Sequence, residues 1–328
     1  MDEIFEKILF NGYGLKLYSA KRIRTCLICS TDKGITALKK RPADSLMVSF
    51  EGACREKLIE NGFDKISSFI KTVDDEYCFT YLDQIYTLEP YRELITPDTD
   101  NEKVILSAVK TLAQMHNAAY GLDFEGGRST LGRLEELFNK RTAYLRHIRK
   151  DIIRRGDYDI MDMIIKNNYD YFISRSVAAV EKLKSSGYEK LVAESAEKKT
   201  FCHNSYKSGN YMLDRNNSIV VESMPKAAYE IPCWDIAFFL RRMMKKADFD
   251  CEYMKRIFFT YAGNTVFTKQ EEDVVKAIIT FPWKFMNLCN EYYNKKRNYC
   301  LNPAVERFQR CIEASVNEEK ILMSEEEG

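Results

Sequence analysis

The stretch from residue 201 to residue 240 constrains the fold of this chain more than any other, because it sets polar residues at fixed spacings beside short apolar runs. It begins Phe-Cys-His203-Asn-Ser205-Tyr-Lys-Ser-Gly-Asn210, so Ser205 follows His203 by two residues and Asn210 follows Ser205 by five. A β-branched apolar run at 218–221 comes next and is typical of a strand. The stretch therefore predicts a polar loop held among short strands.

The spacing of these polar residues matches the catalytic segment of kinases, in which an aspartate follows the histidine by two residues and an asparagine comes five residues later. His203 and Asn210 occupy two of these places, and Ser205 stands at the place of the aspartate. The aspartate orients the acceptor hydroxyl and takes its proton, and the asparagine oxygen coordinates a metal ion. The pattern indicates a phosphoryl-transfer loop in which the base position is degenerate.

The second metal contact of such a site is also altered. A second aspartate normally follows the next strand, but here the run at 218–221 leads into Glu222-Ser223-Met224. Glu222 offers carboxylate oxygens to Mg²⁺, although its longer side chain would shift the ion. A loop shift of one residue would place Ser223 there instead. Both stay open as the second metal position, with Asn210 as the other ligand.

Several segments together resemble the spore coat protein S (CotS-like) family, which is related to aminoglycoside and choline kinases. The resemblance covers nearly the whole chain, in segments 111–116, 182–191, 203–210, 234–242, 281–285 and 292–297. It implies an α+β, protein-kinase-like fold with a small, mainly antiparallel N-terminal lobe and a large helical C-terminal lobe. It also implies synthesis in the cytoplasm of the mother cell, a place in the endospore coat, and other spore coat proteins as partners.

The order of the expected elements agrees with such a fold. Short β-branched or alternating runs predict strands over 15–20, 24–31, 35–40, 66–72, 77–82 and 84–88. One helix is expected over residues 43–60, and Asn61-Gly62 would end it. We therefore expect an N-terminal lobe over residues 1–90 and a helical C-terminal lobe over 91–328, which contains the catalytic-loop-like segment 201–225.

Lys39 is the candidate for the lysine that holds nucleotide phosphates, because it lies late in the third predicted strand. Glu56 on the following helix is expected to pair with it. Lys40 would take the role if the strand register slipped by one residue. Glu89 and Tyr91 lie in the expected hinge between the lobes, where an adenine would bind, and the proline between them lacks an N–H donor.

The first two predicted strands are joined without glycine. Residues 19–24 read Ser-Ala-Lys-Arg-Ile-Arg. Without glycine the backbone cannot approach phosphates closely. This weakens the expectation of tight ATP binding.

The composition excludes several classes of function. Lysine plus arginine (50) balance aspartate plus glutamate (49), giving a net charge of +1, which argues against nucleic acid or an acidic membrane as the main partner. The ten cysteines are scattered, and only Cys26 and Cys29 lie close together, where core packing is favoured over metal binding. With no signal peptide and no long apolar run, we expect no membrane span and a reducing compartment.

Further residues are expected to have structural roles. In kinases related to the CotS-like family, the residue at the place of Asp235 bonds the backbone of the catalytic loop. His116 is expected to tether its helix to neighbouring elements. Thr268-Lys-Gln-Glu271 is a capping box, and apolar residues at helical spacing between 165 and 183 predict an amphipathic helix.

The altered loop allows three interpretations. The first is a catalytically inactive pseudokinase with a structural or binding role in the spore coat and no required cofactor; losing a general base typically slows a reaction by roughly 10²–10⁴-fold. The second is an active phosphotransferase with a rearranged site, using ATP and Mg²⁺ and a small-molecule acceptor. A nucleotide-binding switch without turnover lies between them. Two losses in one centre favour the first.

Overall fold

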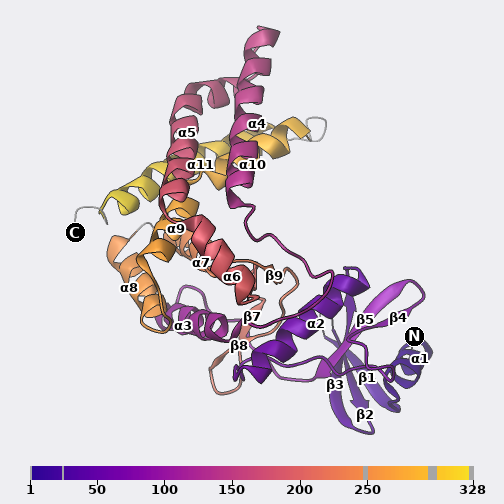
Figure 1. Ribbon diagram of the computed structural model, residues 1–328. Helices are drawn as coiled ribbons and strands as arrows, with labels where there is room; N and C mark the ends of the chain where they lie inside the picture. Colours follow the sequence, from indigo (N-terminus) through magenta and orange to yellow (C-terminus); the bar gives the residue numbers. More distant parts are fainter. Residues whose placement is uncertain (1, 24–25, 247–249, 295–300, 325–328) are drawn as a thin grey trace. The chain divides into compact units, whose positions relative to one another are not determined.

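The structure, a computed structural model, describes residues 2–23, 26–246, 250–294 and 301–324 (Figure 1). Parts of the predicted strand 24–31 and of the segment 292–297 lie outside the described residues. The chain divides into two compact units. Unit 1 comprises Met1–Ser129, Ser195–Asp235 and Thr260–Thr265, and unit 2 comprises Thr130–Glu194, Ile236–Phe259 and Val266–Gly328. The predicted lobe boundary at residue 90 stays a prediction.

A five-stranded antiparallel sheet is the largest β-structure of unit 1 (Figure 1). In spatial order its strands are β1 (Leu17–Ile23), β2 (Cys26–Thr31), β3 (Gly34–Arg41), β5 (Gln84–Pro90) and β4 (Phe79–Tyr81). Helix α1 (Asp2–Tyr13) shares a buried cluster with the sheet, in which Ile8 and Leu9 of the helix pack with Leu38 and Leu88 of the strands. The antiparallel order confirms the predicted small β lobe.

Two details of this region differ from the sequence-based expectation. Helix α1 was not predicted. Gly12 lies within this helix, and Gly14 follows its end at a φ of +62°, a conformation that commonly ends a helix. The predicted strand over 66–72 is wrong, because this segment makes isolated bridges to two different strands instead of a continuous ladder.

Helix α2 (Ser45–Glu60) confirms the predicted helix and its end. The side chain of Asp44 caps its start by accepting the Met47 N–H at 2.8 Å. Asn61 ends the helix, and Gly62 follows at a φ of +88°, which other residues rarely adopt. The helix carries two buried charged residues, Glu51 and Arg55.

The rest of unit 1 supports the catalytic-loop-like segment. It contains α3 (Glu102–Ala118) and two short antiparallel pairs. The pairs are β6 (Phe201–Cys202) with β9 (Ala228–Tyr229), and β7 (Tyr211–Leu213) with β8 (Ile219–Val221). The loop 203–210 connects β6 to β7, so both of its ends are fixed by strands. Strand β8 lies where the apolar run at 218–221 predicts a strand.

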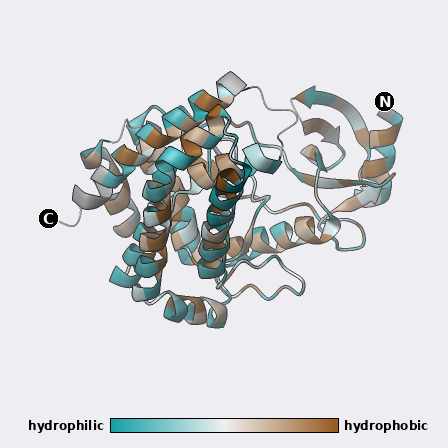
Figure 2. Cartoon of the chain, turned by 90° about the horizontal axis from the view of Figure 1, so that it is seen from above, coloured by the Kyte–Doolittle hydropathy of each residue, from teal (hydrophilic) through white to brown (hydrophobic). Residues whose placement is uncertain are grey.

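Unit 2 is helical in its described residues. The helices from α4 onward lie wholly or mainly in unit 2, although the end of α6, the start of α7 and the end of α8 belong to unit 1. They are α4 (Leu134–Arg155), α5 (Ile160–Ser185), α6 (Tyr188–Glu197), α7 (Cys233–Lys246), α8 (Cys251–Ala262), α9 (Lys269–Thr280), α10 (Trp283–Asn294) and α11 (Leu301–Ser324). The predicted apolar residues of α5 are buried, and the predicted capping box at Thr268 forms. Figure 2 shows hydrophobic and hydrophilic residues interleaved along the helices. Among the described residues, none of the helices is both long and apolar enough to cross a bilayer.

Candidate functional site: a kinase-type cavity with internally paired charges

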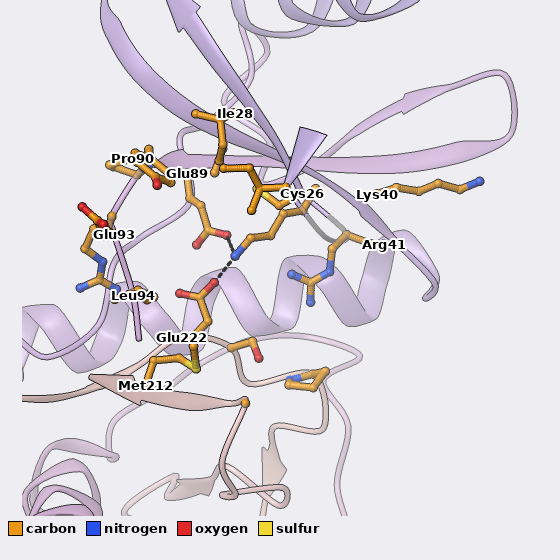
Figure 3. Close-up of a pocket in the computed structure, with 18 of the residues that line it drawn as sticks. Cys26, Ile28, Lys40, Arg41, Glu89, Pro90, Glu93, Leu94, Met212 and Glu222 are labelled. Carbon is orange, nitrogen blue, oxygen red and sulfur yellow. Dashed lines mark hydrogen bonds and ion pairs between the residues drawn. The ribbon is translucent and has the colours of Figure 1, made fainter. Parts of the chain in front are cut away.

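Lys39 lies at the centre of a group of paired charges in unit 1. Its ammonium group forms ion pairs with the carboxylates of Glu89 on β5 and of Glu222, which follows β8 (Figure 3). Lys40 is exposed and points away from these ion pairs, so the alternative in which Lys40 replaces Lys39 is not adopted. Burial disfavours the charged lysine, but the two carboxylates outweigh it and raise the pKa of Lys39 above its usual range.

The predicted ion pair between Lys39 and Glu56 is wrong. Glu56 instead accepts a hydrogen bond from the hydroxyl of Tyr77 at 2.5 Å. The error is one of helix phase, because residues five apart on an α-helix differ by about 140° around its axis. Glu51 is the buried acid of α2, and it pairs with Arg41 of β3. Sequence reasoning had therefore selected an acid on the wrong face of the helix.

Arg55 is a buried residue that sequence reasoning missed. Its guanidinium donates to the carboxylate of Glu51 at 2.6 and 3.1 Å and to that of Glu89 at 3.2 Å. It also donates to the backbone carbonyls of Ser67 at 3.1 Å and Glu222 at 2.9 Å. These bonds use all the N–H donors of the group. The sequence signals only the contact between Arg55 and Glu51, because their four-residue spacing places both on one helix face.

Glu51 predicts how the fold responds to acid. Burial alone would raise its pKa, but Arg55 and Arg41 lower it from 4.5 to about 2. A carboxyl with a depressed folded-state pKa stabilises the fold above its unfolded-state pKa, and that contribution disappears as the pH falls through the folded-state value. Between about pH 4.5 and about pH 2, the free energy of unfolding in urea should therefore fall more steeply for the wild type than for Glu51→Gln. Parallel pH profiles would contradict this assignment.

The catalytic-loop-like segment is held by hydrogen bonds among its own polar residues. The N–H of Ser205 donates to Nδ1 of His203 at 3.2 Å, and burial lowers the pKa of His203, which keeps that nitrogen an acceptor. The amide nitrogen of Asn210 donates to the carbonyl and hydroxyl oxygens of Ser205 at 2.7 and 3.1 Å. Its amide oxygen, the expected metal ligand, accepts the Ser223 hydroxyl at 3.2 Å. Both ends of the Asn210 amide are thus engaged within the protein.

Asp235 anchors this loop at the start of α7. Its carboxylate accepts the backbone N–H of His203 at 2.7 Å and lies 3.3 Å from Nε2 of His116. The other nitrogen of His116 is hydrogen-bonded to the hydroxyl of Tyr261 at 2.7 Å. The ligand atoms of Cys202, His116 and Asp235 lie within 4.8 Å of one another, close enough to bind one metal ion. However, burial raises the pKa of Cys202, and its thiol donates to the backbone carbonyl of Glu230, which favours a structural role. The expected roles of Asp235 and His116 are confirmed.

A cavity of about 550 Å³ opens beside the Lys39 ion pairs (Figure 3). Strands β2 and β3, the hinge residues after β5, and residues of the loops around β7 and β8 line it. At the hinge, the N–H of Tyr91 donates to the carbonyl of Ile35 at 3.1 Å, and Pro90 has no N–H. Of the predicted residues, those that line this cavity are Lys39, Lys40, Glu89, Tyr91, Glu222 and Ser223. Its volume suits a small-molecule ligand.

A network of ion pairs extends from the wall of this cavity into the buried residues of α2. Three cations are paired with three carboxylates: Lys39, Arg41 and Arg55 with Glu51, Glu89 and Glu222. A phosphate group approaching Lys39 would meet an ammonium group that two carboxylates already neutralise. The arrangement therefore favours a closed internal ion network over anion capture.

Comparison with known protein families matches the chain to the family described as "Spore coat putative kinase YutH", over residues 6–325. The chain belongs to this family. The match extends over almost the whole sequence, and it confirms the CotS-like, spore coat resemblance of the individual segments. For this YutH-family chain, association with the spore coat is what the family's description suggests.

Solved structures place this YutH-family chain in the kinase-like phosphotransferase fold. An aminoglycoside phosphotransferase from Alicyclobacillus acidocaldarius has a TM-score of 0.80 at 17% identity, over 99% of this chain and 94% of the other. An amicoumacin kinase in complex with AMP-PNP and Ca²⁺ has a TM-score of 0.57 at 10% identity, over 97% and 93%. A choline/ethanolamine kinase family protein from Mesorhizobium loti has a TM-score of 0.50 at 13% identity, over 98% of both chains. At these identities the likeness is one of fold, and it confirms the predicted fold class.

Proposed function

We propose that this YutH-family chain is a pseudokinase, a kinase-fold protein that transfers no phosphoryl group and has a structural or binding role in the endospore coat. The observation that carries the proposal is Ser205, a hydroxyl at the place of the general base. Ser205 accepts a hydrogen bond from Asn210 and has no carboxylate with which to take an acceptor's proton. Such a loss lowers a rate by roughly 10²–10⁴-fold.

The residues at the cavity do not fit Mg-ATP as they stand. Lys39 is neutralised by Glu89 and Glu222, and the oxygen of Asn210 is occupied by the hydroxyl of Ser223. A bound nucleotide and its metal ion would compete with these internal contacts for Lys39 and Asn210.

Mg-ATP is expected to leave the thermal stability of the purified protein unchanged. A ligand that binds only the native state at a hundredfold excess over its Kd would stabilise it by about 2.7 kcal/mol, which a melting curve readily detects. The measurement is a melting curve with and without millimolar Mg-ATP, together with ATP consumption in the presence of choline, sugars or aminoglycosides. Stabilisation without consumption would favour the nucleotide-binding switch instead.

We also propose that the protein lies in the spore coat and contacts other coat proteins. The family's description supports the location. Fractionation of spores into coat and core extracts tests the location. Recovery of the protein outside the coat extract would oppose it.

An active small-molecule kinase is the second candidate, because Glu222 supplies a carboxylate to the same cavity as Lys39. Carboxylate oxygens suit Mg²⁺, and Asn210 retains the identity expected of the other metal ligand. This candidate requires Glu222 to leave Lys39 when the metal binds. The Glu222→Gln experiment discussed below separates the two functions.

A further inference from the structure

A second cavity, of about 510 Å³, lies within unit 2 among α7, α10 and α11. Its lining is strongly cationic. Six basic side chains contribute to it, against a single acid, Glu318: Arg241, Arg242, Lys245, Lys284, Arg307 and Arg310. Because the whole chain has a net charge of only +1, this concentration of positive charge is local.

Neighbouring acids neutralise only part of that charge. Arg307 pairs with Glu291 at 2.7 Å, and Arg310 pairs with Glu306 at 3.3 Å. The carboxylate of Glu318 lies 4.0 Å from Arg241 but also pairs with a further cation of α5 at 3.4 Å. Among the described residues, cations outnumber acids at this lining, where Lys245 and Lys284 contribute exposed ammonium groups.

Arg241 is a largely buried cation of this lining. Its side chain is 12% exposed, and its Nε atom is buried with no hydrogen-bond partner among the described residues. Burial lowers its pKa, and Glu318 opposes that effect in part. An unpaired donor on a buried cation is unfavourable, and a negative ligand in the cavity would stabilise the charge of this guanidinium.

The start of α10 adds a second feature that suits an anion. Lys284 and Phe285 line the cavity and lie in the first turn of this twelve-residue helix. First-turn N–H groups lack partners within their own helix, and the helix dipole is positive there. Phe238 and Trp283 supply apolar wall beside the charges. Cationic side chains, among them the largely buried Arg241, and a helix N-terminus thus line one cavity.

We propose that this cavity binds a small multivalent oxyanion, a phosphate ester or a polycarboxylate. The site is separate from the kinase-type cavity, since every residue lining it belongs to unit 2. Several cations at one place favour a ligand with at least two negative groups, because each group can form its own charge-assisted hydrogen bonds.

The test uses inorganic pyrophosphate as the probe and isothermal titration calorimetry at constant ionic strength. We expect one pyrophosphate to bind per chain, and Lys245→Glu together with Lys284→Glu to weaken binding at least tenfold. Both lysines are exposed, and an acid at position 284 suits a helix start. The matched control is Lys150→Glu with Lys190→Glu, which makes the same charge change at exposed residues outside the cavity lining.

A third variant, Lys39→Met, separates the two cavities. Binding that persists in Lys39→Met and in the control but weakens in the Lys245/Lys284 variant supports the proposal. If pyrophosphate binding weakened equally in the control, the effect would be one of net charge alone. If Lys39→Met lost pyrophosphate binding, the anion would bind in the kinase-type cavity. Either result overturns the proposal. Binding of anionic lipid vesicles or polyglutamate without pyrophosphate binding also overturns it, because the ligand would then be a surface or a polymer.

Discussion

Replacing Arg55 with methionine is expected to lower the free energy of unfolding by about 3–5 kcal/mol, the range for removing one partner of a buried ion pair. Arg55 is fully buried, and its guanidinium donates to the buried carboxylates of Glu51 and Glu89. Methionine fills a similar volume but leaves both acids short of a cation in a place with little water. Urea unfolding of the two purified proteins measures the difference.

Lys57→Met on the same helix is the matched control. Lys57 pairs with Glu60 at 2.6 Å at the protein surface, where an ion pair contributes about 0–1 kcal/mol. If Arg55→Met lost no more stability than this control, the buried charges of α2 would not have the structural role that we assign to them.

Glu222→Gln is expected to raise the affinity for ADP, measured without Mg²⁺, about tenfold. The substitution removes one of the two carboxylates that neutralise Lys39, so a phosphate oxygen can take its place. A charge-assisted hydrogen bond contributes roughly 1.5–3 kcal/mol, and 1.4 kcal/mol corresponds to a factor of ten. Glu222 is less buried than Glu89, with side-chain exposures of 22% and 4%, so its replacement disturbs the fold less.

Glu93→Gln is the control for this experiment, because Glu93 lines the same cavity but pairs with Arg215 instead of Lys39. It should change the affinity little. The opposite outcome for Glu222→Gln, a loss of affinity for Mg-ATP, would identify Glu222 as a metal ligand. That result would favour the active kinase over the inactive scaffold.

The loop was predictable from sequence because its chemistry depends on short spacings. The places of His203, Ser205 and Asn210 follow from counting residues, and the structure joins the three by hydrogen bonds. Lys39 was predicted from its place late in the third strand, with Lys40 left open as the alternative, and the structure puts Lys39 in the ion pairs. Counting residues thus identifies the loop, whereas the choice between Lys39 and Lys40 comes from the strand register in the structure.

The partners of Lys39 were not predictable, because they come from distant parts of the chain. Glu222 lies 183 residues beyond Lys39, and its side chain reaches the lysine through the pairing of short strands. The phase of α2 decided between Glu51 and Glu56, and neither residue's type indicates which one is buried. The guanidinium of Arg55 also donates to acceptors on distant elements, those of Ser67, Glu89 and Glu222. The four-residue spacing to Glu51 does not reveal these bonds.

The central claim, that the Ser205 loop does not transfer phosphoryl groups, is tested most directly with ATP labelled at its γ-phosphate. The purified protein would be incubated with Mg²⁺ and a panel of hydroxyl-bearing acceptors, with Asn210→Ala as a parallel sample. We expect no transfer above the rate shown by Asn210→Ala. Transfer at an ordinary enzymatic rate of about 1 s⁻¹ or more, abolished in Asn210→Ala, would contradict the account.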